Sequence, residues 1–266
     1  GLANYLNECF KDMEQISVVV GHDCRNNSRL FAEISANIFS ANGIKVYLFD
    51  ALRPTPELSY AVRETGSIAG INVTASHNPK EYNGYKVYGE DGAQMSPEDT
   101  EKVVAHINAI EDYLAVSAEE NSSLILPVPQ QLDTDYIDEL SKLTLSKEAV
   151  EKCGKDLKLV YTPVHGSGYV PVMAILNKLG IHATVVEAQT KKDTEFSTVK
   201  VPNPEFKETL SMGIALANKI DADVVFGTDP DADCLGVALK NEEGDLVALS
   251  GNQVGVLLAD YVMLRL

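Results

Sequence analysis

Apolar runs of strand length alternate along this chain with segments of helical period, and this alternation limits the fold more than any other feature. A β-branched run over 16–20 ends at Gly21, and a segment of helical period over 28–42 follows it. The order recurs after 157–161, where a glycine-rich turn leads into another helical segment. Strands that alternate with helices favour a largely parallel sheet with helices on both faces. We therefore expect α/β domains, each a three-layer sandwich with a mixed, mostly parallel sheet.

The bounds of the expected elements follow from the same pattern. Strands are expected over 16–20, 44–49, 68–73, 85–88, 157–161, 183–186, 224–226, 235–239 and 246–248. Helices are expected over 28–42, 55–64, 97–110, 133–143, 147–152, 170–179, 210–220 and 251–266. In the first helix, Phe31, Ile34 and Ile38 are expected to face the core, because their spacing places them on one face. Ser96 is the expected cap of the helix that begins at Pro97.

The charge balance excludes one class of partner. With 22 Lys and Arg residues against 39 Asp and Glu, the chain carries a formal charge of −17. Nucleic-acid binding draws most of its affinity from Lys and Arg, so no nucleic-acid partner is expected. A small phosphorylated substrate remains compatible with this charge, because it needs only a local patch or a metal ion.

Cysteine usage and hydropathy indicate where the protein works. The four cysteines, Cys9, Cys24, Cys153 and Cys234, are scattered and form no C-x-x-C pair. We interpret them as reduced thiols of a cytoplasmic protein. No stretch approaches the run of about 18 apolar residues typical of a membrane span, and residues 1–10 lack the features of a signal peptide. No membrane partner is therefore expected.

The strongest chemical signal is a set of three carboxylates, Asp229, Asp231 and Asp233, directly after an apolar strand. Alternate residues of a turn can converge, and like charges that converge are costly unless a cation or protons neutralise them. Oxygen-only ligands favour magnesium, calcium or manganese over zinc. Counted from Asp229, an EF-hand would require Gly where Cys234 stands and Glu where Lys240 stands, so that loop is excluded.

Two other interpretations of the acidic turn remain open from the residues alone. The first is a surface turn whose aspartates cap backbone amides. Its position after a strand argues against this, because α/β proteins bind ligands at the carboxyl edge of the sheet. The second is a phosphatase of the haloacid dehalogenase type, in which a strand-end aspartate such as Asp229 accepts the phosphoryl group.

A second polar turn, over 74–79, also follows an apolar strand. Small neighbours leave the Ser76 hydroxyl accessible, while His77 and Lys86 supply a titratable group and a cation nearby. A serine hydroxyl is a weak nucleophile alone and needs a base or a metal. Taken alone, the turn is better explained as a tight turn in which Ser76 and Asn78 satisfy backbone groups. Together with the acidic turn, it outlines a phosphoryl-transfer site.

Both turns resemble motifs of one enzyme family. The segment 74–86, Thr-Ala-Ser-His-Asn-Pro-Lys-Glu-Tyr-Asn-Gly-Tyr-Lys, resembles the phosphoserine loop of the α-D-phosphohexomutases. The segment 229–233, Asp-Pro-Asp-Ala-Asp, resembles their magnesium loop. Weaker landmarks at 21–28, 162–168 and 202–205 follow in the family's order, so the resemblance covers nearly the whole chain. The extended form to Gln94 is most similar to the phosphoglucomutase branch.

The resemblance implies an intramolecular phosphotransferase that interconverts hexose 1-phosphate and 6-phosphate, with glucose or mannose as the sugar. Ser76 would carry the phosphoryl group, Lys86 would be the general acid/base that also contacts the sugar, and His77 would assist proton transfer. A hexose bisphosphate intermediate would return its other phosphate to Ser76. The implied Mg²⁺ ligands are Ser76 through its phosphate, Asp229, Asp231 and Asp233. The implied substrate contacts are Lys86, Asp233 and Arg25.

One departure from the family pattern raises a further alternative. The family normally has Arg after the third aspartate of the magnesium loop, whereas this chain has Cys234. A neutral thiol cannot replace a guanidinium that grips phosphate. Arg25 is either a substitute for that group or a structural residue near a helix start. A catalytically silent mutase relative is therefore a second alternative to the mutase.

The resemblance also implies how the chain divides. We expect a first domain over 1–153 without the family's opening strand, a second over 154–250, and the first helix of a third over 251–266. The chain opens without Met and ends in an apolar run, so we expect it to be a piece of a longer protein. The sugar-recognising third domain and the phosphate-gripping fourth domain would be missing. The fragment alone is expected to be inactive.

Overall fold

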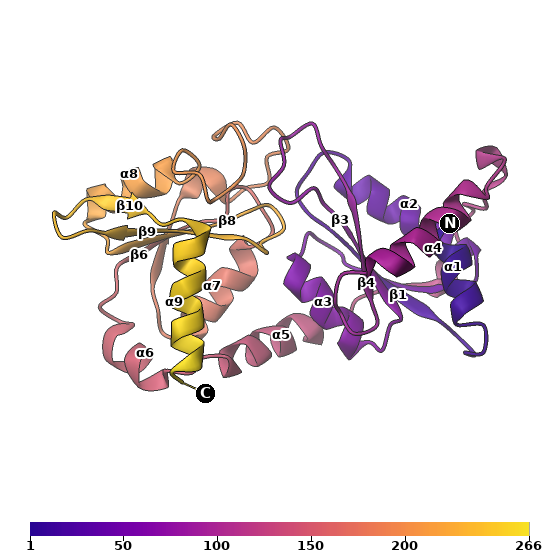
Figure 1. Cartoon of the computed structure of the whole chain (residues 1–266), viewed down its shortest axis with the longest axis horizontal. Coiled ribbons are helices and arrows are strands. Elements are labelled where there is room, and N and C mark those ends of the chain that lie inside the picture. The colour runs from indigo at the N-terminus through magenta and orange to yellow at the C-terminus, as the bar shows by residue number, and fades with distance from the viewer. Residues whose placement is uncertain (266) are drawn as a thin grey trace. The chain divides into compact units, whose positions relative to one another are not determined.

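The computed structural model describes residues 1–265, which form two compact α/β units (Figure 1). The first unit comprises Gly1–Asp23, Asn27–Thr74 and Gly84–Leu132. The second comprises Cys24–Asn26, Ala75–Asn83 and the chain from Asp133 onward. Two short segments from the first half of the sequence thus belong to the second unit, and one of them carries Ser76.

The first unit contains a five-stranded sheet in the order β4-β3-β1-β2-β5. The strands are β1 (Ser17–His22), β2 (Lys45–Leu48), β3 (Ala69–Val73), β4 (Tyr85–Gly89) and β5 (Ile125–Pro127). β1 pairs in parallel with β2 and β3, with Val18 opposite both Val46 and Ala69. β5 is parallel to β2, whereas β4 is antiparallel to β3. The sheet is mixed and mostly parallel, as the alternating pattern predicts.

Helices cover both faces of this sheet. They are α1 (Leu2–Cys9), α2 (Ser28–Ala41), α3 (Thr55–Glu64) and α4 (Pro97–Asn108), with 3-10 turns η1 (Tyr113–Ala115) and η2 (Ser122–Leu124). On one face, α1, α2 and α4 pack against Val18, Val20 and Ile71. On the other, α3 lies so close that a Cβ on Gly70 would be 2.5 Å from a Val62 methyl carbon. The first unit is therefore a three-layer sandwich.

The predicted core face of the 28–42 helix is wrong. Phe31 and Ile34 are each 42% exposed, and the buried side chains of α2 include Ala32, Ala36 and Phe39. The buried stripe is displaced by about one position from the expected one. The two alanines let the helix lie close to the sheet. The prediction considered only large apolar side chains and therefore did not place these alanines on the core face.

The second unit contains a sheet in the order β10-β9-β8-β6-β7. Its strands are β6 (Leu159–Thr162), β7 (Ala183–Val185), β8 (Val224–Thr228), β9 (Leu235–Lys240) and β10 (Leu246–Ala248). β6 is parallel to β7 and β8, while β9 is antiparallel to β8 and β10. The helices are α5 (Gln131–Lys142), α6 (Lys147–Cys153), α7 (Tyr169–Lys178), α8 (Ser211–Ile220) and α9 (Gly251–Met263), with the 3-10 turn η3 (Glu187–Gln189).

Alternate residues of these strands supply two cores, as the period of a strand requires. Val160, Val225 and Ala238 pack with Leu210 and Ala217 at α8. Their sequence neighbours Leu159, Val224 and Val237 pack with Leu176 of α7 and, at the edge, Val254 of α9. Figure 1 shows α8 on one side of the sheet and α7 and α9 on the other. The second unit is thus also a three-layer sandwich.

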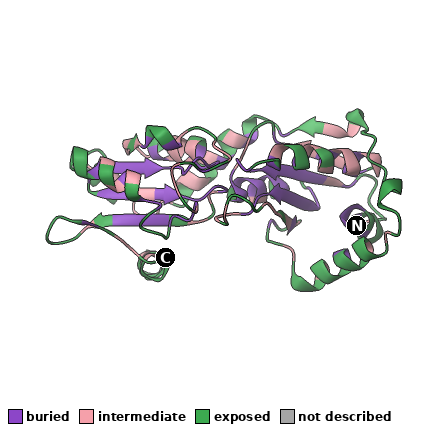
Figure 2. Cartoon of the chain, turned by 90° about the horizontal axis from the view of Figure 1, so that it is seen from above, coloured by how far each residue is buried: buried purple, intermediate pink, exposed green. Residues whose placement is uncertain are grey.

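The last helix, α9, has an apolar sequence but no buried residue, and Figure 2 shows it in green beside the C label. Val256 is 69% exposed and Met263 75% exposed. Ser250 and Gln253 form a reciprocal capping box that begins the helix. Despite its apolar surface, α9 does not reach the length and apolarity of a membrane span, and neither does any other helix within residues 1–265.

Candidate functional site

Two strand-end turns of the second unit meet at one edge of its sheet. β6 and β8 run in parallel, so the turn after β6 and the acidic turn after β8 lie at the same carboxyl edge. The segment 75–83 belongs to this unit as well, and it brings Ser76 to the acidic turn. The structure therefore brings together the two motifs that the sequence singles out.

The three aspartates converge. Asp229 and Asp231 are fully buried and Asp233 is exposed, and one carboxylate oxygen from each lies within 4.8 Å of the others. Between the last two, Ala232 has a left-handed backbone with φ of +51°, unusual for a residue with a Cβ. Burial, and then the charges of Asp231 and Asp233, raise the pKa of Asp229 to about 8. A buried site that holds a proton this tightly fits a cation, so these residues could hold a metal ion.

Ser76 lies beside this acidic trio. Its Oγ donates a hydrogen bond to Asp229 Oδ2 at 2.9 Å, and it lies 3.4 Å from His77 Nδ1. Ser76 also has a left-handed backbone, with φ of +52°. Such a conformation costs about 1–3 kcal/mol in a residue other than glycine and persists only where the surroundings enforce it.

Arg25 holds the backbone of the serine loop, including Ser76, in this conformation. Its side chain is almost fully buried and its guanidinium lies over the Phe196 ring at 5.4 Å. The guanidinium donates to four backbone carbonyls of the serine loop, those of Ser76 (2.6 Å), Asn78 (2.5 Å), Pro79 (2.9 Å) and Tyr82 (3.0 Å). These bonds favour the structural interpretation of Arg25 over a phosphate contact. Its role in substrate binding stays a prediction.

The turn after β6 supports the acidic turn from behind. Ser167 donates to the Pro230 carbonyl through both its backbone N–H and its Oγ, each at 2.9 Å. A Cβ on Gly166 would lie 2.7 Å from Pro230 Cα and 2.8 Å from the Asp229 carbonyl oxygen. This close approach is the reason for glycine at 166. His165 also serves the structure, because both its ring nitrogens have partners, the Lys191 carbonyl and Thr198.

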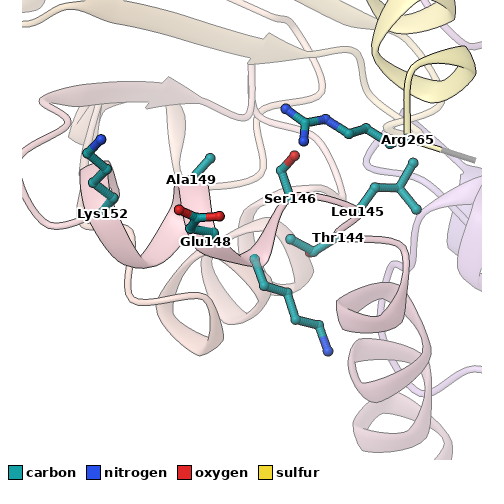
Figure 3. Close-up of a pocket in the computed structure, with 8 residues that line it drawn as sticks. Thr144, Leu145, Ser146, Glu148, Ala149, Lys152 and Arg265 are labelled. Carbon is teal, nitrogen blue, oxygen red and sulfur yellow. The ribbon is translucent and has the colours of Figure 1, made fainter.

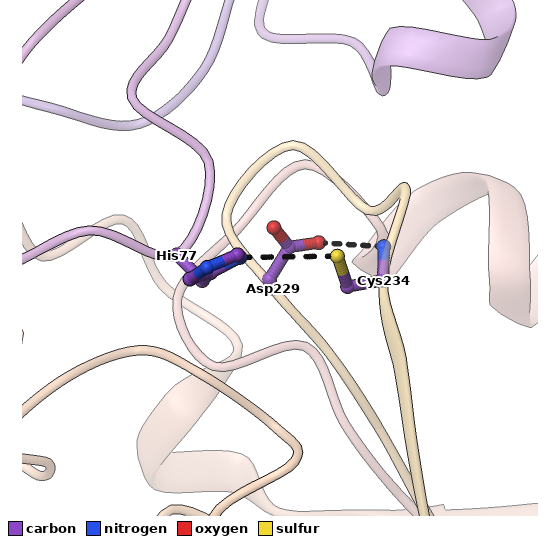
Figure 4. Close-up of side chains that lie close together, drawn as sticks. All are labelled: His77, Asp229 and Cys234. Atoms are coloured by element: carbon purple, nitrogen blue, oxygen red, sulfur yellow. Dashed lines mark hydrogen bonds between the residues drawn. The ribbon is translucent and has the colours of Figure 1, made fainter. Parts of the chain in front are cut away.

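Cys234 follows Asp233 in the sequence, and Figure 4 shows its side chain beside those of Asp229 and His77. Its backbone N–H donates to Asp229 Oδ1 at 3.0 Å, and its Sγ lies 3.9 Å from His77 Nδ1. Its thiol donates to Asp233 Oδ1 at 3.4 Å. Burial, and then the charges of Asp229 and Asp233, raise the pKa of Cys234 to about 12. The thiol is therefore neutral and adds no positive charge here.

Lys86 belongs to the first unit. It lies in β4, opposite Asn72 of β3, and is half-buried. The structure therefore assigns it a strand position, and its predicted acid/base role stays a prediction. Sequence reasoning missed Phe196. It named the turn over 162–168 as a family landmark, but not the support that Gly166 and Ser167 give to the acidic turn.

A separate cavity of about 560 Å³ lies beside α6, away from the acidic turn (Figure 3). It is lined by Thr144, Leu145, Ser146, Lys147, Glu148, Ala149, Lys152 and Arg265. Within the part of the chain that the structure describes, both groups of side chains suited to a metal ion lie at the acidic turn instead. The acidic turn is thus the candidate site.

Comparison with known proteins places this geometry in a family. The family model described as phosphoglucomutase/phosphomannomutase, alpha/beta/alpha domain I, matches residues 1–114, and the model for domain II matches residues 134–244. The predicted bounds at 153 and 250 stay predictions. A phosphoglucomutase of Staphylococcus epidermidis is 41% identical over 268 residues, which cover 98% of this chain and 47% of the relative. The chain thus spans about half the length of that curated relative.

Solved structures agree. A putative phosphomannomutase from Thermus thermophilus matches with a TM-score of 0.80 and 28% identity, over 98% of this chain and 56% of that one. A phosphoglucomutase/phosphomannomutase family protein from Burkholderia thailandensis has the same fold, with a TM-score of 0.69 and 22% identity over 92% of this chain and 51% of its own. The two domain models together match most of the chain, and the curated relative is 41% identical to it. The chain therefore belongs to the phosphoglucomutase/phosphomannomutase family of α-D-phosphohexomutases.

Proposed function

We propose that the protein containing this chain interconverts hexose 1-phosphate and hexose 6-phosphate. The phosphoryl group would pass from Ser76 to a hexose monophosphate, and the bisphosphate formed would return its other phosphate to Ser76. Glucose is the sugar we favour, because the curated relative is a phosphoglucomutase. Mannose is the alternative sugar, in line with the name of the Thermus structure.

The single observation that carries this proposal is the hydrogen bond between Ser76 Oγ and Asp229 Oδ2 at 2.9 Å. A hydroxyl that is to accept and return a phosphoryl group needs charge compensation for the phosphate oxygens. The acidic trio beside Ser76 is suited to hold the cation that provides it.

The proposed roles of the residues follow. Mg²⁺ would be held by the three aspartates and the Ser76 phosphate, and it would supply Lewis acidity to the phosphoryl oxygens. Lys86 would exchange a proton with the sugar hydroxyl, and His77, whose Nδ1 lies 3.4 Å from Ser76 Oγ, would assist. Asp233, the exposed member of the trio, would reach the substrate. We propose the cytoplasm as the location, on the scattered cysteines.

The two alternatives stand differently. An aspartyl-phosphate phosphatase is not favoured, because the chain belongs to the mutase family and Asp229 accepts hydrogen bonds from Ser76 and Cys234. A catalytically silent relative retains one specific observation in its favour. Cys234 places a neutral thiol where the resemblance implies a cation, so the site has one fewer positive charge to stabilise phosphate.

The test is an assay of the full-length protein with glucose 1-phosphate, glucose 1,6-bisphosphate and Mg²⁺, following glucose 6-phosphate. We expect turnover, and we expect Ser76→Ala to reduce it by at least about 1000-fold, as loss of a covalent nucleophile does. The matched control is Ser122→Ala, which removes an exposed hydroxyl from the η2 turn and should change nothing.

The outcomes separate the proposals. Absence of turnover in the wild-type protein, with activity appearing in Cys234→Arg, would support the silent relative. Full activity of Ser76→Ala would contradict the proposed mechanism outright.

A further inference from the structure

A second set of side chains suited to a metal ion overlaps the acidic trio. It consists of His77, Asp229 and Cys234, and one ligand atom from each lies within 4.8 Å of the others. Figure 4 shows the imidazole, the carboxylate and the thiol directed toward a common region. The three residues come from two segments of the second unit, the serine loop and the acidic turn. The fold thus assembles this set from residues 157 positions apart.

The spacing of these atoms fits a small tetrahedral ion. Cys234 Sγ lies 3.9 Å from His77 Nδ1. Around tetrahedral zinc, with bonds of about 2.3 Å to sulfur and about 2.0 Å to nitrogen, the two atoms lie about 3.6 Å apart. These two atoms would therefore need to approach by only a few tenths of an ångström, and the Asp229 carboxylate oxygen lies within 4.8 Å of both. The Asp229 carboxylate is already fixed in place by the Cys234 backbone N–H at 3.0 Å.

The ligand types separate this set from the trio. Carboxylates alone favour a hard cation such as Mg²⁺, whereas a set with sulfur and imidazole nitrogen favours zinc. We propose that His77, Asp229 and Cys234 form a zinc site that shares Asp229 with the acidic trio. On binding, Zn²⁺ replaces the thiol proton of Cys234 and the proton that Asp229 holds in the metal-free site, both protons pass to solvent, and one bond forms to each of sulfur, nitrogen and oxygen.

This set has the form of an open zinc site. Sites with three protein ligands keep a fourth position for water or substrate. Ser76 Oγ lies 2.9 Å from Asp229 Oδ2 and 3.4 Å from His77 Nδ1, so it adjoins that position. The site depends on Cys234, which the proposed mutase reaction does not use. The site shares Asp229 and His77 with the proposed mutase site, so loss of Cys234 is the change that tests the zinc site without removing a residue of the proposed reaction.

Cobalt provides a direct probe, because a thiolate ligand gives Co²⁺ a charge-transfer band in the near ultraviolet, whereas oxygen ligands do not. We expect the metal-free 266-residue chain to develop this band on titration with Co²⁺ and to lose it when Zn²⁺ is added. Cys234→Ser should abolish the band, and His77→Gln should weaken Zn²⁺ binding by about 100-fold or more, exceeding the usual effect of an outer ligand.

Two controls match these variants. Cys153→Ser removes an exposed thiol, and Asp231→Asn removes a carboxylate that belongs only to the acidic trio. Both should keep the band. A band that survives Cys234→Ser, or that Cys153→Ser abolishes, would overturn the proposal, and so would the absence of any band in the wild-type chain.

A second measurement uses the unaltered protein, so its result does not depend on whether a variant folds. Zn²⁺ should protect Cys234 from alkylation, read by mass spectrometry of its peptide, while the exposed Cys9 and Cys153 react as before. Mg²⁺ alone should not slow alkylation of Cys234 to the same extent, because it does not bind sulfur. Equal alkylation of Cys234 with and without Zn²⁺ would contradict the site.

Discussion

At the scale of single residues, Asp229 is the residue that contacts both the serine loop and the backbone of the acidic turn. One of its carboxylate oxygens accepts from Ser76 and the other from the Cys234 backbone. The same carboxylate belongs to both groups of side chains suited to a metal ion. Its burial is unfavourable for a charge, so the metal-free site favours the protonated form.

This protonation predicts how stability depends on pH. The pKa of Asp229 rises from an ordinary carboxyl value to about 8 on folding, so the folded state binds the proton more tightly than the unfolded state does. The stabilisation is complete below about pH 4 and is lost as pH rises toward 8. We expect the melting temperature of the metal-free chain to fall between pH 5 and pH 8, and Mg²⁺ to raise it more at pH 8.

The control separates this effect from general charge repulsion in an acidic protein. Asp229→Asn should flatten the pH dependence, whereas Asp245→Asn, which removes the same charge from an exposed turn, should not. Identical pH profiles for the wild-type chain and Asp229→Asn would show that Asp229 does not hold the proton.

Arg25 is expected to stabilise the protein through its hydrogen bonds to the serine loop. Lysine has three donors against the four carbonyls that the guanidinium serves, and it lacks the fork geometry. Arg25→Lys should destabilise the protein by about 2 kcal/mol, because buried acceptors lose their partners. The melting temperature should then fall by about 4–8 °C.

Arg63→Lys is the matched control, because Arg63 is exposed and donates to Ser59 Oγ at 2.9 Å. It should leave the melting temperature within about 1 °C of the wild type. If Arg25→Lys were equally neutral, Arg25 would not be what holds the serine loop.

At the scale of elements, the two parallel strands β6 and β8 explain why the site forms where it does. Their carboxyl ends place the glycine-rich turn directly against the acidic turn, and Ser167 fixes the Pro230 carbonyl. The acidic turn is thus held from one side by the β6 turn and from the other by the serine loop. Neither contact is local in sequence.

This packing predicts the effect of one methyl group. Gly166→Ala would place a Cβ 2.7 Å from Pro230 Cα, so the acidic turn must shift. We expect Mg²⁺ affinity, measured by calorimetry on the chain, to weaken by about tenfold or more, as other changes behind metal ligands do. Gly255→Ala, where a Cβ would meet nothing within 4 Å, should leave Mg²⁺ affinity unchanged. Equal affinities in both variants would remove the supporting role of the β6 turn.

Local pattern predicted most elements and failed where tertiary packing decides. The helix Thr55–Glu64 and the strand Leu246–Ala248 have the expected bounds, since caps and turns define them locally. The helix Leu2–Cys9 and the edge strand Ile125–Pro127 were missed. The latter lies in a stretch with a polar composition and becomes a strand only by pairing with β2.

The candidate site shows the same division. The residue types at the two strand ends outlined a phosphoryl-transfer site, and the family resemblance implied that Ser76 and Asp229 hold one metal ion. The structure places the two side chains 2.9 Å apart. The partners of Arg25 could not be predicted, because its four acceptors lie more than 50 positions along the chain. The Phe196 ring beneath it lies in an irregular segment without a periodic signal.

At the scale of the whole molecule, the net charge of −17 is compatible with anionic substrates, because the acidic trio is a site for a cation. The chain covers 47% of the staphylococcal phosphoglucomutase. We expect the isolated 266-residue chain to bind Mg²⁺ yet show no appreciable mutase turnover, because further domains would supply sugar recognition. Turnover by the isolated chain in the assay described above would refute this expectation.

The most direct test of the central claim is the site of phosphorylation. The full-length protein is incubated with glucose 1,6-bisphosphate and Mg²⁺, digested, and mapped by mass spectrometry with attention to acid-labile and base-labile phosphate. The account predicts an acid-stable phosphate on Ser76, within the peptide that carries 74–86. A labile acyl phosphate on Asp229, with Ser76 unmodified, would contradict it.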